Sequence, residues 1–110
     1  MTWTIEAALN DDAIKKSEKT NEGYSFWLNG IDTEISVILS VNPLRGGYNF
    51  HLSHYINTPS QISAYIPSRP WGDDEAYALH LAITAITQYY NQSLKDGESP
   101  SSDWLMPSSK

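Results

Sequence analysis

Residues 72–95 read GDDEAYALHLAITAITQYYNQSLK, and this stretch decides the fold. Apolar side chains recur in it at helical spacing, which gives a helix one apolar stripe that needs a cover. They are Leu79, Ala82, Ile83, Ile86, Tyr89 and Tyr90. The acidic run Asp73-Asp74-Glu75 suits the first turn, where the helix dipole favours carboxylates and an Asp can cap free N–H groups. With Asp96-Gly97 as the stop, the pattern predicts a helix from about Gly72 to Lys95.

A hairpin is predicted upstream of this helix. The segments Tyr24–Leu28 and Ile31–Val41 alternate in polarity, and Asn29-Gly30 between them is the preferred pair for a two-residue type I′ turn. Closing the hairpin on this pair sets Leu28 opposite Ile31, Phe26 opposite Thr33 and Tyr24 opposite Ile35. The face so formed continues through Val37, Leu39 and Val41 and is the face expected to be buried.

The segment between hairpin and helix carries further strand signals. Pro43 and Gly46-Gly47 indicate a turn, after which residues 48–56 alternate again, with an inward set of Tyr48, Phe50, Leu52, His54 and Ile56. Residues Ile62–Ile66 are a candidate fourth strand, ended by Pro67. The sequence therefore predicts an α+β domain, an antiparallel sheet of three to four strands with one long C-terminal helix packed on one face.

The two ends of the chain show weaker patterns. In residues 1–22, Ile5, Leu9 and Ala13 fit a helical stripe, while Trp3, Ile5, Ala7 and Leu9 fit strand alternation equally well. We expect a short helix there, followed by a solvated stretch of mixed charge. Residues 1–96 are expected to form a single domain, and residues 97–110 a loose C-terminal tail pinned by Trp104 and Leu105.

The charge balance and the absence of cysteine restrict the function classes. Thirteen Asp and Glu face seven Lys and Arg, a formal net charge of −6, and binding along a phosphate backbone needs clustered basic residues. There is no Cys, which excludes a disulfide scaffold and suits a reducing compartment. No basic and apolar leader opens the chain, and no apolar run approaches roughly 20 residues. We expect a cytoplasmic protein that binds neither nucleic acid nor membrane.

Candidate catalytic and metal-binding residues are sparse. His51 and His54 are three apart on a predicted strand and point to opposite faces, and His80 lies on the flank of the helix. No Ser or Thr stands in a nucleophile motif. The sequence therefore predicts neither an enzyme nor a metal or cofactor site, and it favours His54 as a hydrogen-bonded core or rim residue. The alternative is a small-ligand or enzyme pocket near His54 and several tyrosines.

The outward side of the helix is the feature that needs an explanation. None of residues 76–94 is charged, and its outward side carries Tyr77, Leu81, Thr84 and Gln88. Either the tail or the N-terminal segment covers this face, or it is a subunit or partner interface, since interface cores are poor in charge and rich in aromatics. Trp71, Tyr65 and Tyr55 could join such a surface, although Trp71 could equally staple the helix start. The predicted partner-binding residues are Tyr77, Leu81, Thr84, Gln88 and Trp71.

Residues 64–100 resemble the HicB-type antitoxin domain. The likeness consists of Ala64-Tyr65-Ile66-Pro67, then a helix opening Gly72-Asp73-Asp74-Glu75-Ala76, then Asp96-Gly97-Glu98-Ser99-Pro100. The Gly-Cys that usually follows the Pro in that family is replaced here by Arg69-Pro70-Trp71, and no DNA-binding extension is visible. The resemblance implies a small sheet-and-helix module that neutralises a toxin by binding it.

Together these observations predict a small non-catalytic protein-binding module. An antitoxin, an immunity protein or another inhibitor would fit, acting on a protein partner or by self-association, with a homodimer as one form. An acidic inhibitor would also associate faster with a basic partner.

Overall fold

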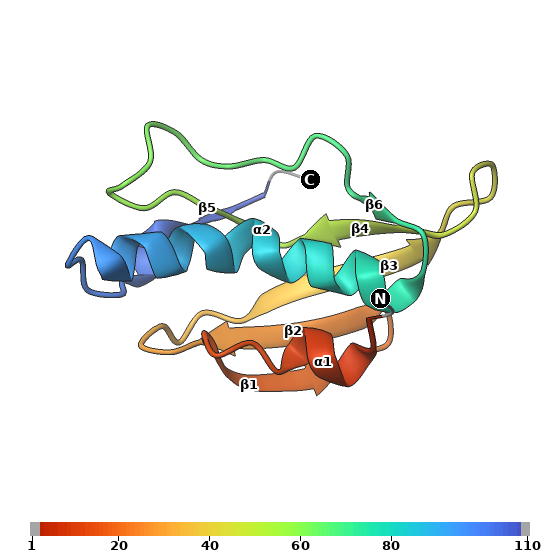
Figure 1. Cartoon of the computed structure of the whole chain (residues 1–110), viewed down its shortest axis with the longest axis horizontal. Coiled ribbons are helices and arrows are strands. Elements are labelled where there is room, and N and C mark those ends of the chain that lie inside the picture. The colour runs from red at the N-terminus through yellow and green to blue at the C-terminus, as the bar shows by residue number, and fades with distance from the viewer. Residues whose placement is uncertain (1–2, 109–110) are drawn as a thin grey trace.

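The computed structural model describes residues 3–108 and shows an α+β domain, as predicted. Five antiparallel strands form the main sheet in the order β1-β2-β3-β4-β6 (Figure 1). They are β1 (Ile14–Lys19), β2 (Gly23–Leu28), β3 (Ile35–Val41), β4 (Tyr48–Leu52) and β6 (Trp71–Gly72). Helices α1 (Ile5–Leu9) and α2 (Glu75–Lys95) lie side by side on one face of this sheet. Among the helices of residues 3–108, none is long and apolar enough to cross a membrane.

Helix α2 begins at Glu75, not at Gly72. The side chain of Asp74 caps it, because the Tyr77 backbone N–H donates to Asp74 Oδ1 at 2.8 Å. Gly72 belongs instead to β6, where a Cβ would lie 2.6 Å from the backbone nitrogen of Ala78. Glycine is therefore needed for this close approach of strand and helix. The predicted C-terminal end at Lys95 is confirmed, with Gly97 at φ +88°.

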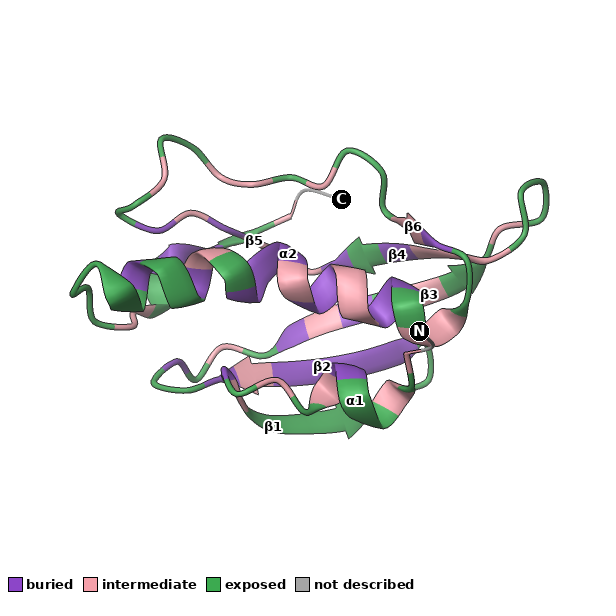
Figure 2. Ribbon diagram, viewed as in Figure 1, coloured by how far each residue is buried: buried purple, intermediate pink, exposed green. Residues whose placement is uncertain are grey.

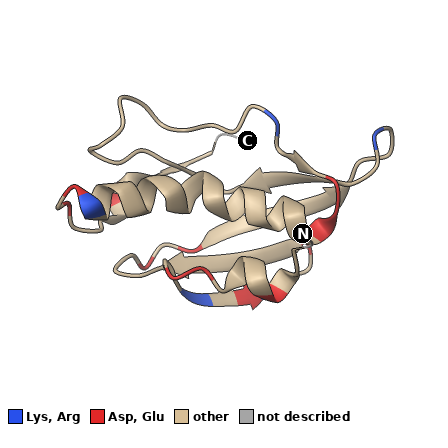
Figure 3. Cartoon of the chain, viewed as in Figure 1, with Lys and Arg blue, Asp and Glu red and all other residues tan. Residues whose placement is uncertain are grey.

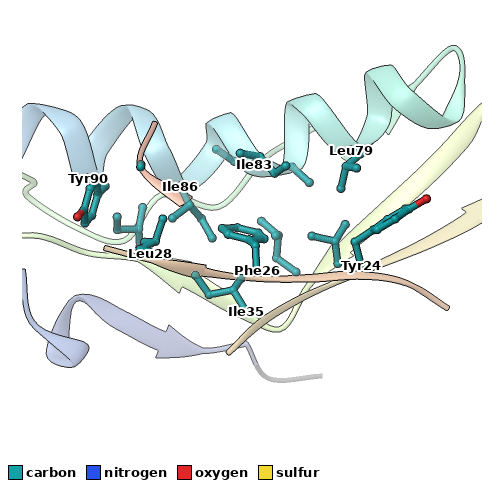
Figure 4. Close-up of a cluster of buried hydrophobic side chains, with 14 of the residues drawn as sticks. Tyr24, Phe26, Leu28, Ile35, Leu79, Ile83, Ile86 and Tyr90 are labelled. Atoms are coloured by element: carbon teal, nitrogen blue, oxygen red, sulfur yellow. The ribbon is translucent and has the colours of Figure 1, made fainter. Parts of the chain in front are cut away.

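The core lies between α2 and the sheet. The predicted inward stripe of the helix packs on the apolar face of β2 and β3, as Figure 4 shows. Phe26, Leu28, Ile35, Leu79 and Ile86 are fully buried, and removal of such apolar surface from water is the main stabilising term. The Tyr90 hydroxyl donates to the backbone carbonyl of Asn29 at 2.5 Å, so the one polar group of that side chain is satisfied.

The predicted hairpin has the right faces but the wrong register. Phe26 pairs with Ile35 and Tyr24 with Val37, and residues 29–34 form a longer connection. The turn at Asn29-Gly30 does form, since the Ile31 backbone N–H donates to the Leu28 carbonyl at 3.1 Å. The chain does not continue from there as a strand, because β3 begins only at Ile35. The shift of two residues preserves which side chains point inward, since strand side chains alternate with period two.

The N-terminal segment contains the expected short helix and an additional strand. Thr4 caps α1 by accepting from the Ala7 backbone N–H at 3.0 Å. The mixed-charge stretch that follows is solvated, as expected, with residues 15–19 exposed, and it forms the edge strand β1, which was not predicted. Its exposed side chains lack apolar alternation, so the strand is defined by backbone pairing to β2. Residues 1 and 2 lie outside the described part of the chain.

The region from β4 onward differs from the prediction in two places. The strand predicted over residues 48–56 breaks at Ser53 into β4 and β5 (His54–Ile56). The fourth strand predicted at Ile62–Ile66 is wrong, because that segment contributes only an isolated bridge between Tyr65 and Ile56. The strand that precedes the helix is the short β6.

The expected loose tail is instead largely ordered against the domain. Residues Ser102–Trp104 form the 3-10 helix η1, and β7 (Leu105–Pro107) pairs with β5 in a second, two-stranded sheet. Trp104 and Leu105 are buried, which agrees with the prediction that they pin the tail to the domain. The Trp104 and Tyr90 rings pack edge to face, with their centroids 6.0 Å apart. Residues 109 and 110 lie outside the described part.

Candidate partner-binding surface

Four of the five predicted residues lie along the side of α2 turned away from the sheet. Tyr77 is 37% exposed, Leu81 and Thr84 are half-buried, and Gln88 is exposed. Figure 2 shows intermediate and exposed positions alternating with buried ones along α2. The Thr84 hydroxyl donates to the Leu81 backbone carbonyl at 3.2 Å, so it makes its hydrogen bond within the helix. The stripe therefore presents two apolar side chains and one amide that are still accessible.

A groove runs along one flank of this stripe. It separates α2 from residues 57–70, here called the strap, which passes beside the helix in Figure 1. The groove has a volume of about 210 Å³ and is lined by Leu81, Thr84, Ala85 and Gln88 of the helix, by Phe50, and by Tyr65, Pro67, Ser68 and Arg69 of the strap. The Tyr65 ring of the strap packs on the Tyr89 ring of α2, with the ring centroids 5.1 Å apart. This contact fixes the strap beside the helix.

The strap itself is unusually apolar on its outer side. Ile62 is fully exposed and Ile66 is 59% exposed. A second hollow of about 390 Å³ lies between residues 60–65 and Tyr89 and continues the surface toward the C-terminal half of the helix. Ile62 lines this second hollow and adds an apolar side chain to its wall.

The opposite flank of α2 is covered by the N-terminal segment. The Trp3 ring stacks on His80 at a centroid distance of 3.6 Å and an interplanar angle of 16°. Further along, the Thr87 hydroxyl donates to Asp11 Oδ2 at 3.3 Å, and Ala8 of α1 is buried. Burial lowers the pKa of His80, partly offset by the nearby Asp11 carboxylate. Of the two explanations for the charge-free helix, cover by the N-terminal segment therefore holds for this flank only.

Trp71 does not join the other four residues. It pairs with Asn49 in the sheet, so its side chain belongs to the sheet face turned away from α2. Its indole N–H donates to the Gly46 carbonyl at 2.7 Å, and the Arg45 guanidinium lies 3.7 Å from the centre of its ring. Trp71 therefore fastens the turn between β3 and β4 and does not staple the start of the helix.

Charged side chains lie around the helix surface and not on it. Figure 3 shows α2 without charge between its two ends. The acidic run Asp73–Glu75 stands just beyond Tyr77 at one end, and Arg69 stands on the strap side of the groove. This distribution gives an apolar centre with a charged rim, which is the usual anatomy of a protein interface.

His51 and His54 lie in neighbouring strands and have different surroundings. His54 is half-buried, its Nδ1 lies 2.8 Å from Ser53 Oγ, and burial lowers its pKa. The hollow beside β4 and Tyr55, lined also by His51, measures about 50 Å³, far below the roughly 300–1,000 Å³ of small-ligand sites. Within residues 3–108, no group of three or more His, Asp or Glu is placed to hold a metal ion.

Comparisons of the chain with protein-family models, with curated proteins and with solved structures find no match, so the function has to be inferred from the surface itself. The groove residues that sequence patterns missed are Phe50, Pro67, Ser68, Arg69 and Ala85. Tyr65 was a candidate because of its ring, but no local pattern indicated that the strap would run alongside α2. That placement depends on the bridge between Tyr65 and Ile56 and on the Tyr65–Tyr89 contact, both of which join residues distant from one another along the chain.

Proposed function

We infer that this chain is a non-catalytic protein-binding module that holds an apolar segment of a partner protein in the groove between α2 and the strap. The observation that supports it most is a helix free of charge over residues 76–94 whose Tyr77 and Leu81 stay accessible beside a groove. Buried Tyr and Leu side chains need no partner, but accessible ones at the centre of an uncharged surface gain free energy when a partner covers them.

The charges around the groove suggest the chemistry of that partner. Asp73–Glu75 lie at the Tyr77 end, and the whole chain has a formal net charge of −6. A segment with apolar anchors followed by Lys or Arg would therefore be steered to this surface and oriented on it. The groove's dimensions suit one or two inserted side chains, and Gln88 offers an amide at its rim.

The resemblance of residues 64–100 to HicB-type antitoxin domains agrees with this proposal, since that segment contains both α2 and the strap residues that line the groove. A toxin-neutralising, immunity or inhibitor role would use this surface. In each of those roles the module binds another protein and carries out no reaction.

The experiment begins with capture of partners by the tagged chain, followed by measurement of Kd with the purified partner. Thr84→Arg places a bulky charge in the groove, and we expect it to raise Kd at least about tenfold, as loss of a binding hot spot does. Ser40→Arg is the matched control, because Ser40 is exposed on the sheet face turned away from α2. Equal binding by the two variants, or loss of binding with Ser40→Arg only, would place the partner elsewhere.

A further inference from the structure

Strand β1 has a free edge. It is the outermost strand of the main sheet, and no strand of residues 3–108 pairs with its outer side. All of residues 15–19 are exposed. This edge lies at the opposite end of the sheet from β6 and the strap, so whatever binds it leaves the groove beside α2 accessible (Figure 1).

The backbone groups that β1 turns outward can be identified from its pairing with β2. The Thr20 backbone N–H donates to the Gly23 carbonyl at 2.9 Å, and hydrogen-bonded pairs alternate along an antiparallel ladder. Lys16 and Glu18 therefore bond to β2, whereas Ser17 and Lys19 point their N–H and carbonyl groups away from it. A strand added at this edge would bond to Ser17 and Lys19.

The side chains of β1 have a pattern that is complementary to itself. A second copy related by a two-fold axis perpendicular to the sheet would pair antiparallel with side chains on matching faces. If the two-fold axis passes beside Lys16, the Lys16 side chains of the two copies face each other and oppose two ammonium groups. If it passes beside Glu18, two carboxylates face each other. Centring it on Ser17 sets Lys16 of each copy opposite Glu18 of the other, in the pair type where side chains are closest.

The remaining charges of the strand, Lys15 and Lys19, have the same sign. Lysines and bulges on a sheet edge ordinarily prevent pairing with foreign strands, and β1 has both, with a shift in register between Ile14 and Lys16. In the Ser17-centred register Lys15 falls opposite Lys19, but Lys15 already pairs with Asp32 at 2.9 Å. Glu6 and Ser17 both line the hollow between α1 and β1. Glu6 therefore places a carboxylate on the sheet face that also carries Ser17.

We propose that β1 is a self-association edge at which a second copy of this chain adds antiparallel about Ser17, joining two sheets into one. Within one chain Lys16 Nζ lies 3.3 Å from Glu18 Oε2. In the dimer each of these side chains turns to the other copy, so that two equivalent cross-strand ion pairs replace the two pairs within the chains. The dimer presents two α2 grooves far from the joint, so this proposal does not depend on the partner-binding role.

Reversal of the two charges tests the register. Lys16→Glu and Glu18→Lys alone each oppose like charges, and we expect either to raise the dimer Kd at least about tenfold in sedimentation equilibrium. The double variant, Lys16→Glu with Glu18→Lys, restores opposite charges and should dimerise as the natural chain does. A mixture of the two single variants should form a heterodimer, because one then carries two acids and the other two bases. Failure of both rescues overturns the proposal. A natural chain that stays monomeric up to about 1 mM also overturns it, because its binding free energy would be weaker than about −4 kcal/mol.

A cysteine at the centre of the pair provides a second test. The chain has no cysteine, so Ser17→Cys creates a single thiol that would face its own copy. Directly opposed residues in a hydrogen-bonded pair have Cα atoms about 5.5 Å apart, within the range that a disulfide bridges. We expect Ser17→Cys to form a covalent dimer on mild oxidation much faster than the control Ser63→Cys, whose exposed position lies on the strap. Equal rates for the two variants would contradict pairing at β1, and unchanged circular dichroism shows that both remain folded.

Discussion

The two flanks of α2 are alike in sequence and different in structure. Both come from the charge-free stretch 76–94, and neither carries a residue type that would mark it as inner or outer. One flank is closed by the N-terminal segment, through the stacking of Trp3 on His80 before α1 and the contact of Thr87 with Asp11 after it. The other opens into the groove beside the strap. The absence of charge on a helix thus suggests that other protein atoms pack against its surface. It does not show whether those atoms belong to the same chain or to a partner.

We expect the two flanks to differ most in how much stability the protein loses when a charge is introduced. The loss should be large on the flank that the N-terminal segment closes. Ala8 of α1 is buried, so Ala8→Asp forces an unpaired carboxylate into the contact or detaches the helix. We expect a loss of about 3 kcal/mol in the free energy of unfolding, measured by urea titration. Gln88→Asp, the matched change on the open flank, should cost no more than about 0.5 kcal/mol because Gln88 is exposed. Similar losses for the two variants would mean that the flanks do not differ.

Charges introduced on the outward stripe of α2, beside the groove, should reduce stability less. They should have a large effect on partner binding. The pair Tyr77→Asp and Leu81→Asp would unfold the domain if this face were internal. Because Tyr77 is 37% exposed and Leu81 is half-buried, we expect a loss of only about 1–2 kcal/mol and a folded protein. Partner binding should be abolished, as measured by titration calorimetry with the captured partner. Retained binding in the folded double variant would exclude this stripe as the interface.

The smallest expected effect is a pH dependence confined to the closed flank. Burial lowers the pKa of His80, so the unfolded chain takes up a proton at a higher pH than the folded one. The stabilisation is fully present above about pH 6.5 and is lost as the pH falls through the lower, folded-state pKa. His80→Phe keeps a ring against Trp3 and should flatten the decline in melting temperature between pH 7 and 5. A decline of unchanged slope would show that His54, whose pKa burial also lowers, accounts for it.

Sequence patterns predicted the parts of this fold that short-range periodicity controls. The helix up to its end at Lys95, an Asp cap near its start and the inward set of β2 and β3 all follow from spacing that a few turns or one strand contain, whereas the predicted start at Gly72 was three residues too early. The four outward residues of α2 were found for the same reason. Trp71 was misplaced because the face of a two-residue strand depends on its pairing with Asn49, which is distant along the chain.

The sequence by itself determined which side chains are inward, because burial on one face imposes a period of two on strands and about 3.6 on helices. Only the tertiary structure decided what lies against the outward ones. The register of β2 and β3 shows only in their pairing, Phe26 with Ile35 and Tyr24 with Val37, and β1 became a strand because β2 offered an edge to it. In the same way the N-terminal segment closed one flank of α2 and the strap left the other open. Each of these outcomes rests on contacts between segments far apart in the chain, which local periodicity does not encode.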